Sequence, residues 1–191
     1  LFCPRGCAIL YVAEPDRVLP TVTSHGYGKG FESEFSQQGT RDETALLVLP
    51  AAAAFYRGLG QEAITRHCRS TLSQGVDLLT SAWGTETPMG PPGPDPAWHS
   101  GFMALVRMPI EFDPAAIEAE STDSGGLIRH GKIFQALHNK LLDDFSVEVA
   151  ALFFLNDRLH VRVSAHIYTS VTDFEVLAMA VTELCASKWS P

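Results

Sequence analysis

One stretch decides the fold: Leu159-His160-Val161-Arg162-Val163-Ser164-Ala165-His166-Ile167-Tyr168. Apolar side chains occupy the odd-numbered positions, and side chains with a polar group occupy the even-numbered ones. Successive side chains of a β-strand point to opposite faces, so strict alternation with β-branched residues is typical of a half-buried strand. We therefore expect residues 159–168 to form a strand with one face in a core.

The polar face of this strand has an unusual composition. It carries one guanidinium, Arg162, together with a hydroxyl, two imidazoles and a phenol, where a generic solvated face would be rich in Lys, Glu and Thr. A planar guanidinium held on a rigid strand suits bidentate capture of a carboxylate. The alternative is an exposed strand face that happens to hold Arg and His, and the spacing alone does not decide between the two.

The bulk composition excludes several classes of protein. The 191 residues are 46% hydrophobic and 19% charged, as in ordinary globular chains with one or two cores. A net charge of −8 argues against nucleic acid or an anionic membrane as a partner. The sequence has no run of about 18 apolar residues, so we expect no membrane span.

The cysteines indicate a compartment rather than a metal site. Cys3 and Cys7 lack a second pair of ligands, so we expect no zinc site and no other metal. Together with Cys68 and Cys185 they fit free thiols in a reducing compartment, which predicts a cytoplasmic protein. The chain starts at Leu1 without a methionine or a signal-type segment, which suggests a fragment.

The C-terminal half predicts an α/β arrangement, an antiparallel sheet covered by helices. Strands are expected at 102–108 and 147–155, the latter forming a hairpin with 159–168 through a tight turn at Asn156-Asp157. An amphipathic helix is expected at about 127–142. A last helix should be capped by Thr172 and Glu175 and should turn one side inward: Phe174, Leu177, Ala178, Val181 and Cys185.

The N-terminal half predicts a buried strand followed by helices. The continuous apolar run of residues 7–13 is typical of a strand buried on both faces. Thr40 and Glu43 form a capping-box pattern that predicts a helix from Thr40, kinked at Pro50. A long helix is expected from Gln61 to about Trp83, with one apolar stripe made of Ile64, Cys68, Leu72, Val76, Leu79 and Trp83.

A segment rich in Pro and Gly, residues 84–101, predicts the domain boundary because it cannot form a helix or a central strand. We therefore expect an N-terminal domain with the long linking helix at 1–83, a linker at 84–101 and a small α/β domain at 102–191.

A family resemblance rests on the polar face of the alternating stretch. Arg162-x-Ser164-x-His166-x-Tyr168, followed by a short turn and an Asp-led helix, resembles the C-terminal signature of class V aminotransferases, most of all the isopenicillin N epimerase-like branch. These are fold-type I enzymes that depend on pyridoxal phosphate (PLP). The resemblance implies the C-terminal part of that fold: the end of the PLP-binding large domain, a long linking helix and a small domain with an antiparallel sheet. Arg162 matches the arginine that binds the substrate α-carboxylate.

The resemblance also implies a cofactor contact and a partner. Gly39 and Thr40 match the residues that contact the PLP phosphate across a dimer interface, which implies a homodimer. A helix N-terminus with a threonine hydroxyl would suit a phosphate. The alternative is that Thr40 is only an N-cap.

The Schiff-base lysine falls outside the chain by the same resemblance. Pro4-Arg5-Gly6 before an apolar strand resembles the segment just after that lysine, which would lie immediately before Leu1. The catalytic residue is thus unknown within the chain. Lys29, in a glycine-containing loop, is expected to be solvated. The roles of His25, His160 and His166 stay open.

The predicted function is that of a C-terminal fragment of a PLP-dependent, isopenicillin N epimerase-like enzyme acting on an amino acid. Cysteine desulfurases share the fold but carry a catalytic cysteine on the loop before the arginine strand, and residues 112–126 have none. An epimerase-like or lyase-like reaction needs no such thiol. The alternatives are a non-catalytic truncated derivative that pairs with a full-length subunit, or a desulfurase-like or lyase-like relative.

Overall fold

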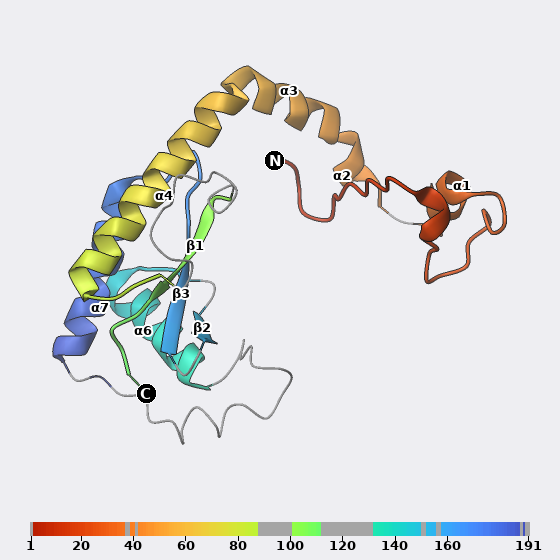
Figure 1. The fold of residues 1–191 in the computed structure, drawn as a ribbon. Helices are drawn as coiled ribbons and strands as arrows, with labels where there is room; N and C mark the ends of the chain where they lie inside the picture. Colours follow the sequence, from red (N-terminus) through yellow and green to blue (C-terminus); the bar gives the residue numbers. More distant parts are fainter. Residues whose placement is uncertain are drawn as a thin grey trace. The chain divides into compact units, whose positions relative to one another are not determined.

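In the computed structural model the alternating stretch forms strand β3, Arg158–Ser164, the central strand of an antiparallel sheet with the order β1-β3-β2 (Figure 1). The outer strands are β1, Met103–Arg107, and β2, Leu152–Leu155. The structure describes residues 2–36, 39–40, 42–87, 101–111, 132–149, 152–155, 158–187 and 189. They divide into two units, Leu1–Gln61 and Glu62–Pro191, and each is described by itself.

The register of β3 separates a core face from an open face. Val161 pairs with Val106 of β1 and with Leu152 of β2, and it is fully buried together with Val106. Arg162 pairs with Leu105, and its side chain is exposed on the opposite face. The alternation predicted from the sequence therefore holds along the strand, with one exception: His160, on the polar side of the pattern, is only 5% exposed.

The strand is shorter than predicted, because it ends at Ser164 and not at Tyr168. The backbone N–H of His166 donates to Thr169 Oγ1 (3.0 Å), and the Thr169 N–H donates back to the His166 carbonyl (2.9 Å). This turn takes the chain out of the ladder. Tyr168 is consequently 81% exposed. The predicted strand at 147–155 is likewise reduced to β2, and the turn predicted at residues 156–157 lies outside the described residues.

The long helix α4 has the bounds that the sequence predicts, Gln61–Trp83, and every residue of its apolar stripe is buried. It packs on the last helix, α7, Val171–Ala186. Gly75 of α4 lies against the ring of Phe174, where an added Cβ would come within 2.4 Å of a ring carbon. The Trp83 indole Nε1–H donates to the Ala178 carbonyl (3.3 Å), which fixes the other end of the contact.

Helix α7 begins at a different cap from the predicted one. Ser170 is its N-cap and forms a capping box with Asp173, so the predicted pair of Thr172 and Glu175 lies two residues too far along the chain. The inward prediction for Cys185 is also wrong: this residue is exposed, and its neighbour Leu184 is buried instead. The other predicted inward residues of the helix are buried.

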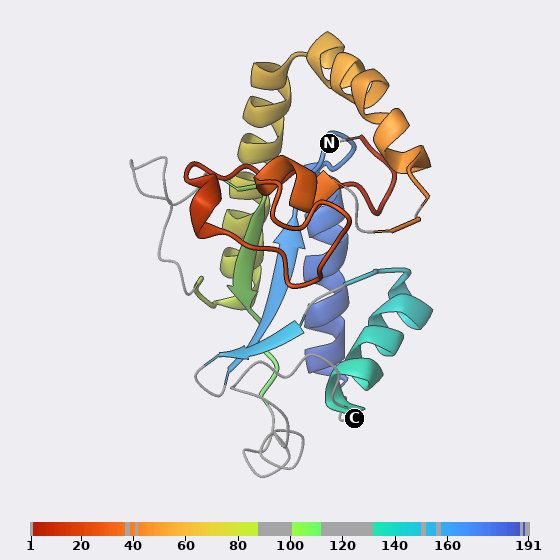
Figure 2. The same ribbon diagram turned by 90° about the vertical axis from the view of Figure 1, so that its right-hand side faces the viewer.

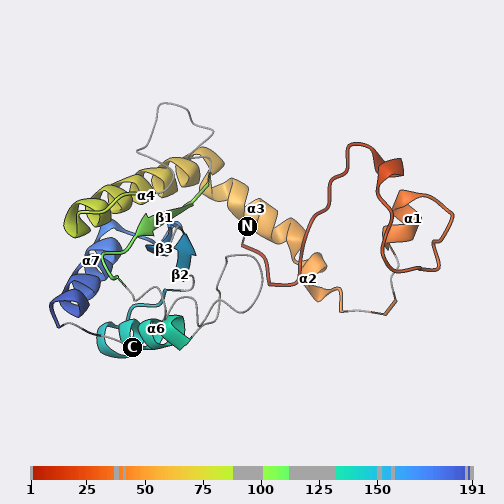
Figure 3. The same ribbon diagram turned by 60° about the horizontal axis from the view of Figure 1, so that its bottom comes forward.

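Helix α6, Lys132–Phe145, overlaps the region predicted to be helical at 127–142 and ends three residues beyond it, while residues 127–131 lie outside the described residues. Its apolar side is buried as predicted: Ile133, Phe134, Leu137 and Leu141. Figures 2 and 3 show α7 between α4 and α6, with the strands in front of α4 and α7 in Figure 2. Helices therefore cover one face of the sheet, and Arg162 projects from the other.

The N-terminal unit contains short elements. These are a 3₁₀ turn at Pro15–Arg17, α1 (Phe31–Ser36), α2 (Thr44–Leu47) and α3 (Leu49–Leu59). The predicted buried strand at residues 7–13 is wrong: Ile9, Leu10 and Tyr11 are 71%, 61% and 85% exposed. A strand needs neighbours for its backbone hydrogen bonds, and the described residues of this unit contain no strand. Pro50 occupies the first turn of α3 and so begins a helix rather than kinking one.

The division between the two units lies elsewhere than the domain boundary expected at residues 84–101. The division falls at the start of α4, which groups with the C-terminal unit because its stripe packs there. Residues 85 and 86 belong to the same unit: Thr85 Oγ1 donates to the Arg107 carbonyl (2.7 Å), and the Arg107 N–H donates to the Glu86 carbonyl (3.1 Å). Residues 88–100 of the predicted linker lie outside the described residues. None of the described helices is both long and apolar enough to cross a bilayer.

Candidate functional site

Arg162 sits at the centre of the sheet with its side chain on the open face. Its cross-strand partner on β1 is Leu105, which offers no charge to the guanidinium. The other two arginines of the sheet are neutralised: Arg107 Nη1 lies 2.9 Å from Glu86 Oε1, and Arg158 Nη1 lies 2.5 Å from Glu111 Oε1. In the described part of the chain no carboxylate forms an ion pair with Arg162. This arginine is therefore available to an external anion.

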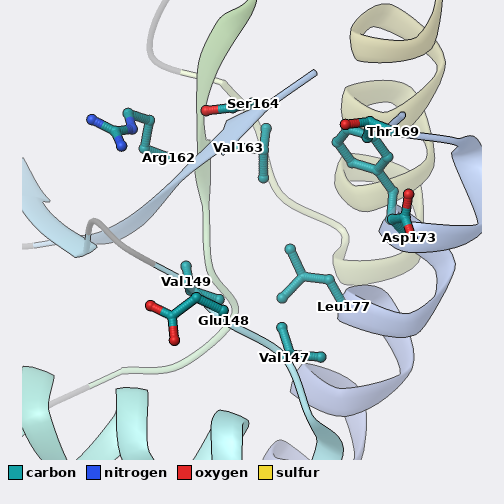
Figure 4. A pocket seen from close by; sticks show the side chains of 10 residues that line it. Val147, Glu148, Val149, Arg162, Val163, Ser164, Thr169, Asp173 and Leu177 are labelled. Carbon is teal, nitrogen blue, oxygen red and sulfur yellow. The ribbon is translucent and has the colours of Figure 1, made fainter. Parts of the chain in front are cut away.

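A cavity of about 280 Å³ lies beside this arginine, between β3, residues 147–149 and the start of α7 (Figure 4). Its walls combine apolar side chains with a few polar ones: Val147, Glu148, Val149, Arg162, Val163, Ser164, Thr169, Asp173, Phe174 and Leu177. Figure 4 shows the guanidinium of Arg162 and the Ser164 hydroxyl on one side of β3 and the side chain of Val163 on the other. The cavity thus has an apolar interior with charged groups at its rim.

Two carboxylates line the cavity, and both are held by other groups. Asp173 accepts hydrogen bonds from the backbone N–H of Ser170 (2.8 Å) and from its hydroxyl (3.2 Å). Glu148 Oε1 lies 2.9 Å from His138 Nε2, which ties residues 147–149 to α6. The hydrogen bond to Glu148 is the main reason that the pKa of His138 is raised above its ordinary value. The sequence analysis missed this pair, because the two residues show no spacing pattern that would single them out.

His160 is a structural residue rather than an exposed acid–base group. It is 5% exposed, and its Nδ1 lies 2.9 Å from the Arg158 carbonyl, where the N–H form of that nitrogen would donate. Burial lowers the pKa of His160, and the nearby Arg107 guanidinium lowers it further, against an opposing effect of the Arg158 carbonyl. Burial therefore favours the neutral form of this imidazole.

His166 and Tyr168 form a stacked pair beyond the end of β3. Their ring centroids are 4.6 Å apart with an interplanar angle of 27°. His166 is partly buried and Tyr168 is exposed. The turn at residues 166–169 holds both rings beyond the ladder, so neither side chain stands on the strand face that carries Arg162.

Gly39 and Thr40 are exposed, but they do not begin a helix. The predicted capping box is wrong: α2 begins at Thr44, and the Asp42 carboxylate accepts the Thr44 N–H (2.9 Å). This local hydrogen bond competes with the longer-range cap from Thr40, and the bonds that Asp42 accepts from Thr44 lower the pKa of Asp42. Gly39 has a φ of 108°, which L-residues rarely adopt. These residues belong to the N-terminal unit and Arg162 to the C-terminal one, so each part of the predicted site is described by itself.

The loop that holds His25 and Lys29 is internally bonded, and both side chains are exposed. Ser24 Oγ donates to the Glu34 carbonyl (3.0 Å), and the Gly28 N–H donates to Glu34 Oε1 (3.0 Å). Exposure of Lys29 agrees with the predicted solvated lysine. Among the described residues, no group of three or more His, Cys, Asp or Glu side chains could hold a metal ion.

Comparison with known proteins places the chain near two kinds of enzyme. It is similar to the L-cysteine desulfhydrase-like protein lolT2 of Epichloe uncinata, at 25% identity over 216 residues, covering 97% of this chain and 47% of the relative. It is also similar to the isopenicillin N epimerase of Amycolatopsis lactamdurans, at 29% identity over 201 residues, covering 96% of this chain and 44% of the relative. No family model matches the chain.

The chain spans less than half the length of the curated relatives that it matches. These relatives support the resemblance to class V aminotransferase-like enzymes at the level of the broad family. The mixture of helices with a small antiparallel sheet is compatible with the predicted α/β class.

Proposed function

We propose that the chain is the C-terminal portion of a PLP-dependent enzyme of the class V aminotransferase type, and that Arg162 holds the α-carboxylate of an amino-acid substrate. The observation that carries the proposal is the exposed guanidinium on the central strand, which no described carboxylate neutralises. A guanidinium offers two parallel N–H groups to a carboxylate, and a strand fixes their direction. The similarity to an isopenicillin N epimerase and to an L-cysteine desulfhydrase-like protein supports the same class of chemistry.

The residues of the N-terminal unit fit a PLP phosphate in part. The Thr40 side chain is exposed and does not cap α2, so its hydroxyl is available to a phosphate. A helix dipole adds nothing there, because α2 has only four residues and begins at Thr44. When bound, PLP supplies an electron sink for chemistry at the substrate α-carbon. Gly39 and Thr40 would hold its phosphate, in a homodimer by the resemblance, while Arg162 would orient the substrate.

A second candidate is a lyase that acts on L-cysteine. It is favoured by the names of the desulfhydrase-like relatives, which match as much of this chain as the epimerase does. Cleavage of the carbon–sulfur bond of cysteine needs the same carboxylate anchor, so Arg162 has the same role in both candidates. They differ in product, since an epimerase inverts a stereocentre and a desulfhydrase releases sulfide.

The coding sequence upstream of Leu1 is the first test. A His-Lys motif directly before Leu1, within an open reading frame, supports the enzyme. A start codon close to Leu1 without that motif favours a non-catalytic derivative that pairs with a full-length subunit, and the enzymatic proposal then fails for this chain. Incubating the protein from the complete reading frame with L-cysteine, and measuring sulfide, separates the lyase from the epimerase.

Arg162→Lys in that complete protein tests the role of the arginine. Lysine keeps the charge but loses the two parallel N–H groups of the guanidinium, so KM should rise and kcat/KM should fall. The fall in kcat/KM should correspond to a loss of about 2–5 kcal/mol of transition-state stabilisation. PLP retention should not change, because the phosphate is held elsewhere. Arg158→Lys is the matched control, since it lies on the same strand and a lysine can still pair with Glu111. Equal kinetics for both variants would show that Arg162 does not bind the substrate.

A further inference from the structure

A cluster of charged side chains joins the chain after α4 to the end of β1. The Arg107 guanidinium lies 2.9 Å from Glu86 Oε1 through Nη1 and 3.8 Å from Glu111 Oε1 through Nη2. Two further hydrogen bonds join the same places: Thr85 Oγ1 donates to the Arg107 carbonyl (2.7 Å), and the Arg107 N–H donates to the Glu86 carbonyl (3.1 Å). Arg158 of β3 pairs with Glu111. Two arginines and two carboxylates therefore balance in charge at this end of the sheet.

A buried histidine lies beside this cluster. His160 of β3 is the cross-strand partner of Arg107 on β1, and its side chain is 5% exposed. Its partner on β2 is Phe153, a residue without charge. The Nδ1 of His160 lies 2.9 Å from the Arg158 carbonyl, which accepts hydrogen bonds, so the proton of the neutral ring belongs on Nδ1. A second proton on the ring would add a third cation to a cluster with two carboxylates.

The surroundings of His160 oppose such a charge. Burial, which removes water from the imidazolium, is the main reason that the pKa of His160 is lowered, and the Arg107 guanidinium lowers it further by repulsion. The Arg158 carbonyl and the Glu86 carboxylate act in the opposite direction without cancelling these effects. The Glu86 side chain is 66% exposed, so solvent weakens its attraction. The closed cluster therefore excludes a proton that an open, hydrated form would accept.

We propose that His160 makes the contact of residues 85–86 with β1 sensitive to acid: below about pH 6.5, protonation of the imidazole opens this contact while the rest of the unit stays folded. An imidazolium needs water and distance from Arg107, and opening supplies both. Because β1 is an outer strand, this side can open while the pairing of β2 with β3 is kept. Acid thus releases the first residues of the segment that joins α4 to β1. The inference is independent of the proposed enzymatic function.

Amide hydrogen exchange of the full chain of 191 residues at pH 7.5 and pH 5.5, corrected for the intrinsic exchange rates, tests the inference. The Arg107 amide is the reporter, because it donates to the Glu86 carbonyl. Its protection should fall by up to about tenfold, since an open form with the ordinary pKa of 6.5 gains about tenfold over the closed form for each pH unit below that value. The Val147 amide, which donates to the Leu141 carbonyl in the same unit, is the internal control and should not lose protection.

Two variants assign the effect to the histidine. His160→Asn should make the protection of the Arg107 amide independent of pH in this range, because the asparagine amide does not titrate and can donate to the Arg158 carbonyl from nearly the position of Nδ1. His67→Asn, at an exposed position on α4, is the matched control and should keep the fall in protection.

Three results would overturn the inference. No fall at the Arg107 amide would show that the contact does not respond to acid, and an equal fall at the Val147 amide would show that the whole unit unfolds. A fall that persists in His160→Asn would assign the response to other groups. If that variant does not fold, NMR titration of the His160 ring in the unaltered chain decides: a pKa below 6.5 supports the inference, and a pKa at or above 6.5 contradicts it.

Discussion

The contact between α4 and α7 can be tested by Gly75→Ala, where two physical effects oppose each other. Alanine is better than glycine inside a helix by about 1 kcal/mol. The added Cβ would, however, lie 2.4–2.5 Å from three ring carbons of Phe174. Ordinary carbon contacts are about 3.5–4.0 Å, so the ring or the helix would have to move by about 1 Å.

The packing effect should prevail because Phe174 has no room to yield. Its side chain is only 4% exposed, so the ring cannot turn into solvent. Overpacking of a core costs about 1–3 kcal/mol. Subtracting the gain in helix propensity from the packing cost leaves a loss of about 0–2 kcal/mol in the free energy of unfolding. Because the ring is so tightly enclosed, we expect a loss of about 1–2 kcal/mol. Since Phe174 also lines the cavity, the substitution should disturb the candidate site.

Amide hydrogen exchange measures this loss helix by helix. Protection of amides in α4 and α7 should fall by the stated free energy in Gly75→Ala. Gly58→Ala is the matched control, because Gly58 is also helical but an added Cβ there meets nothing within 4 Å. Protection in α3 should therefore rise by up to about 1 kcal/mol. A double variant with Phe174→Leu should lose less than the sum of the single losses.

Two results would refute the reasoning. Greater protection of α4 in Gly75→Ala would show that helix propensity prevails and that the two helices are not closely packed. Strict additivity in the double variant would show that the loss does not come from the ring of Phe174. The double-variant cycle matters because a loss in Gly75→Ala alone could arise from any displacement of the helix.

Three further predictions concern other residues. His138→Gln should destabilise the chain at pH 5.5 and have less effect at pH 8. The pKa of His138 is raised in the folded chain, so its bond to Glu148 contributes fully below the ordinary pKa of 6.5 and is lost as the pH rises through the pKa of the folded chain. Urea unfolding at the two pH values measures the difference. Thr40→Ala in the protein from the complete reading frame should weaken PLP retention with no loss of α2 stability, since Thr40 is not its cap, and unchanged retention would remove Thr40 from the phosphate site. After incubation of the chain with PLP and reduction by borohydride, peptide mapping should find no stoichiometric adduct on Lys29, an exposed lysine, and such an adduct would contradict a lysine located before Leu1.

Local sequence patterns predicted the buried side chains correctly where a helix or strand packs against other elements of the same unit. The stripe of α4 repeats every three or four residues, and these residues are buried because α7 lies along them. The alternation of β3 likewise predicted that Val163 faces the core and that Arg162 lies on the opposite face, and Val163 is buried as predicted. In both cases the periodicity of the side chains matches the geometry of the element, so the sequence alone is sufficient.

The failures arise where two local signals compete or where partners are needed. At the start of α2, Asp42 bonds to Thr44 and prevents the cap predicted at Thr40. The apolar run at residues 7–13 has the composition of a buried strand, but the described residues of its unit offer no strand to pair with. The alternation also does not predict the burial of His160, because that burial depends on what covers the polar side at that end of the sheet.

The direction of the Arg162 side chain follows from the packing of its strand. Three arginines lie on the sheet, and two of them have acidic partners, Glu86 for Arg107 and Glu111 for Arg158. Arg162 lies opposite Leu105, and a shift of β1 by one residue would place Val106 there and turn the core side chains outward. The buried pairing of Val106 with Val161 opposes that shift, because both side chains are fully inaccessible. The same core that buries Val161 therefore directs the guanidinium of Arg162 away from the helices.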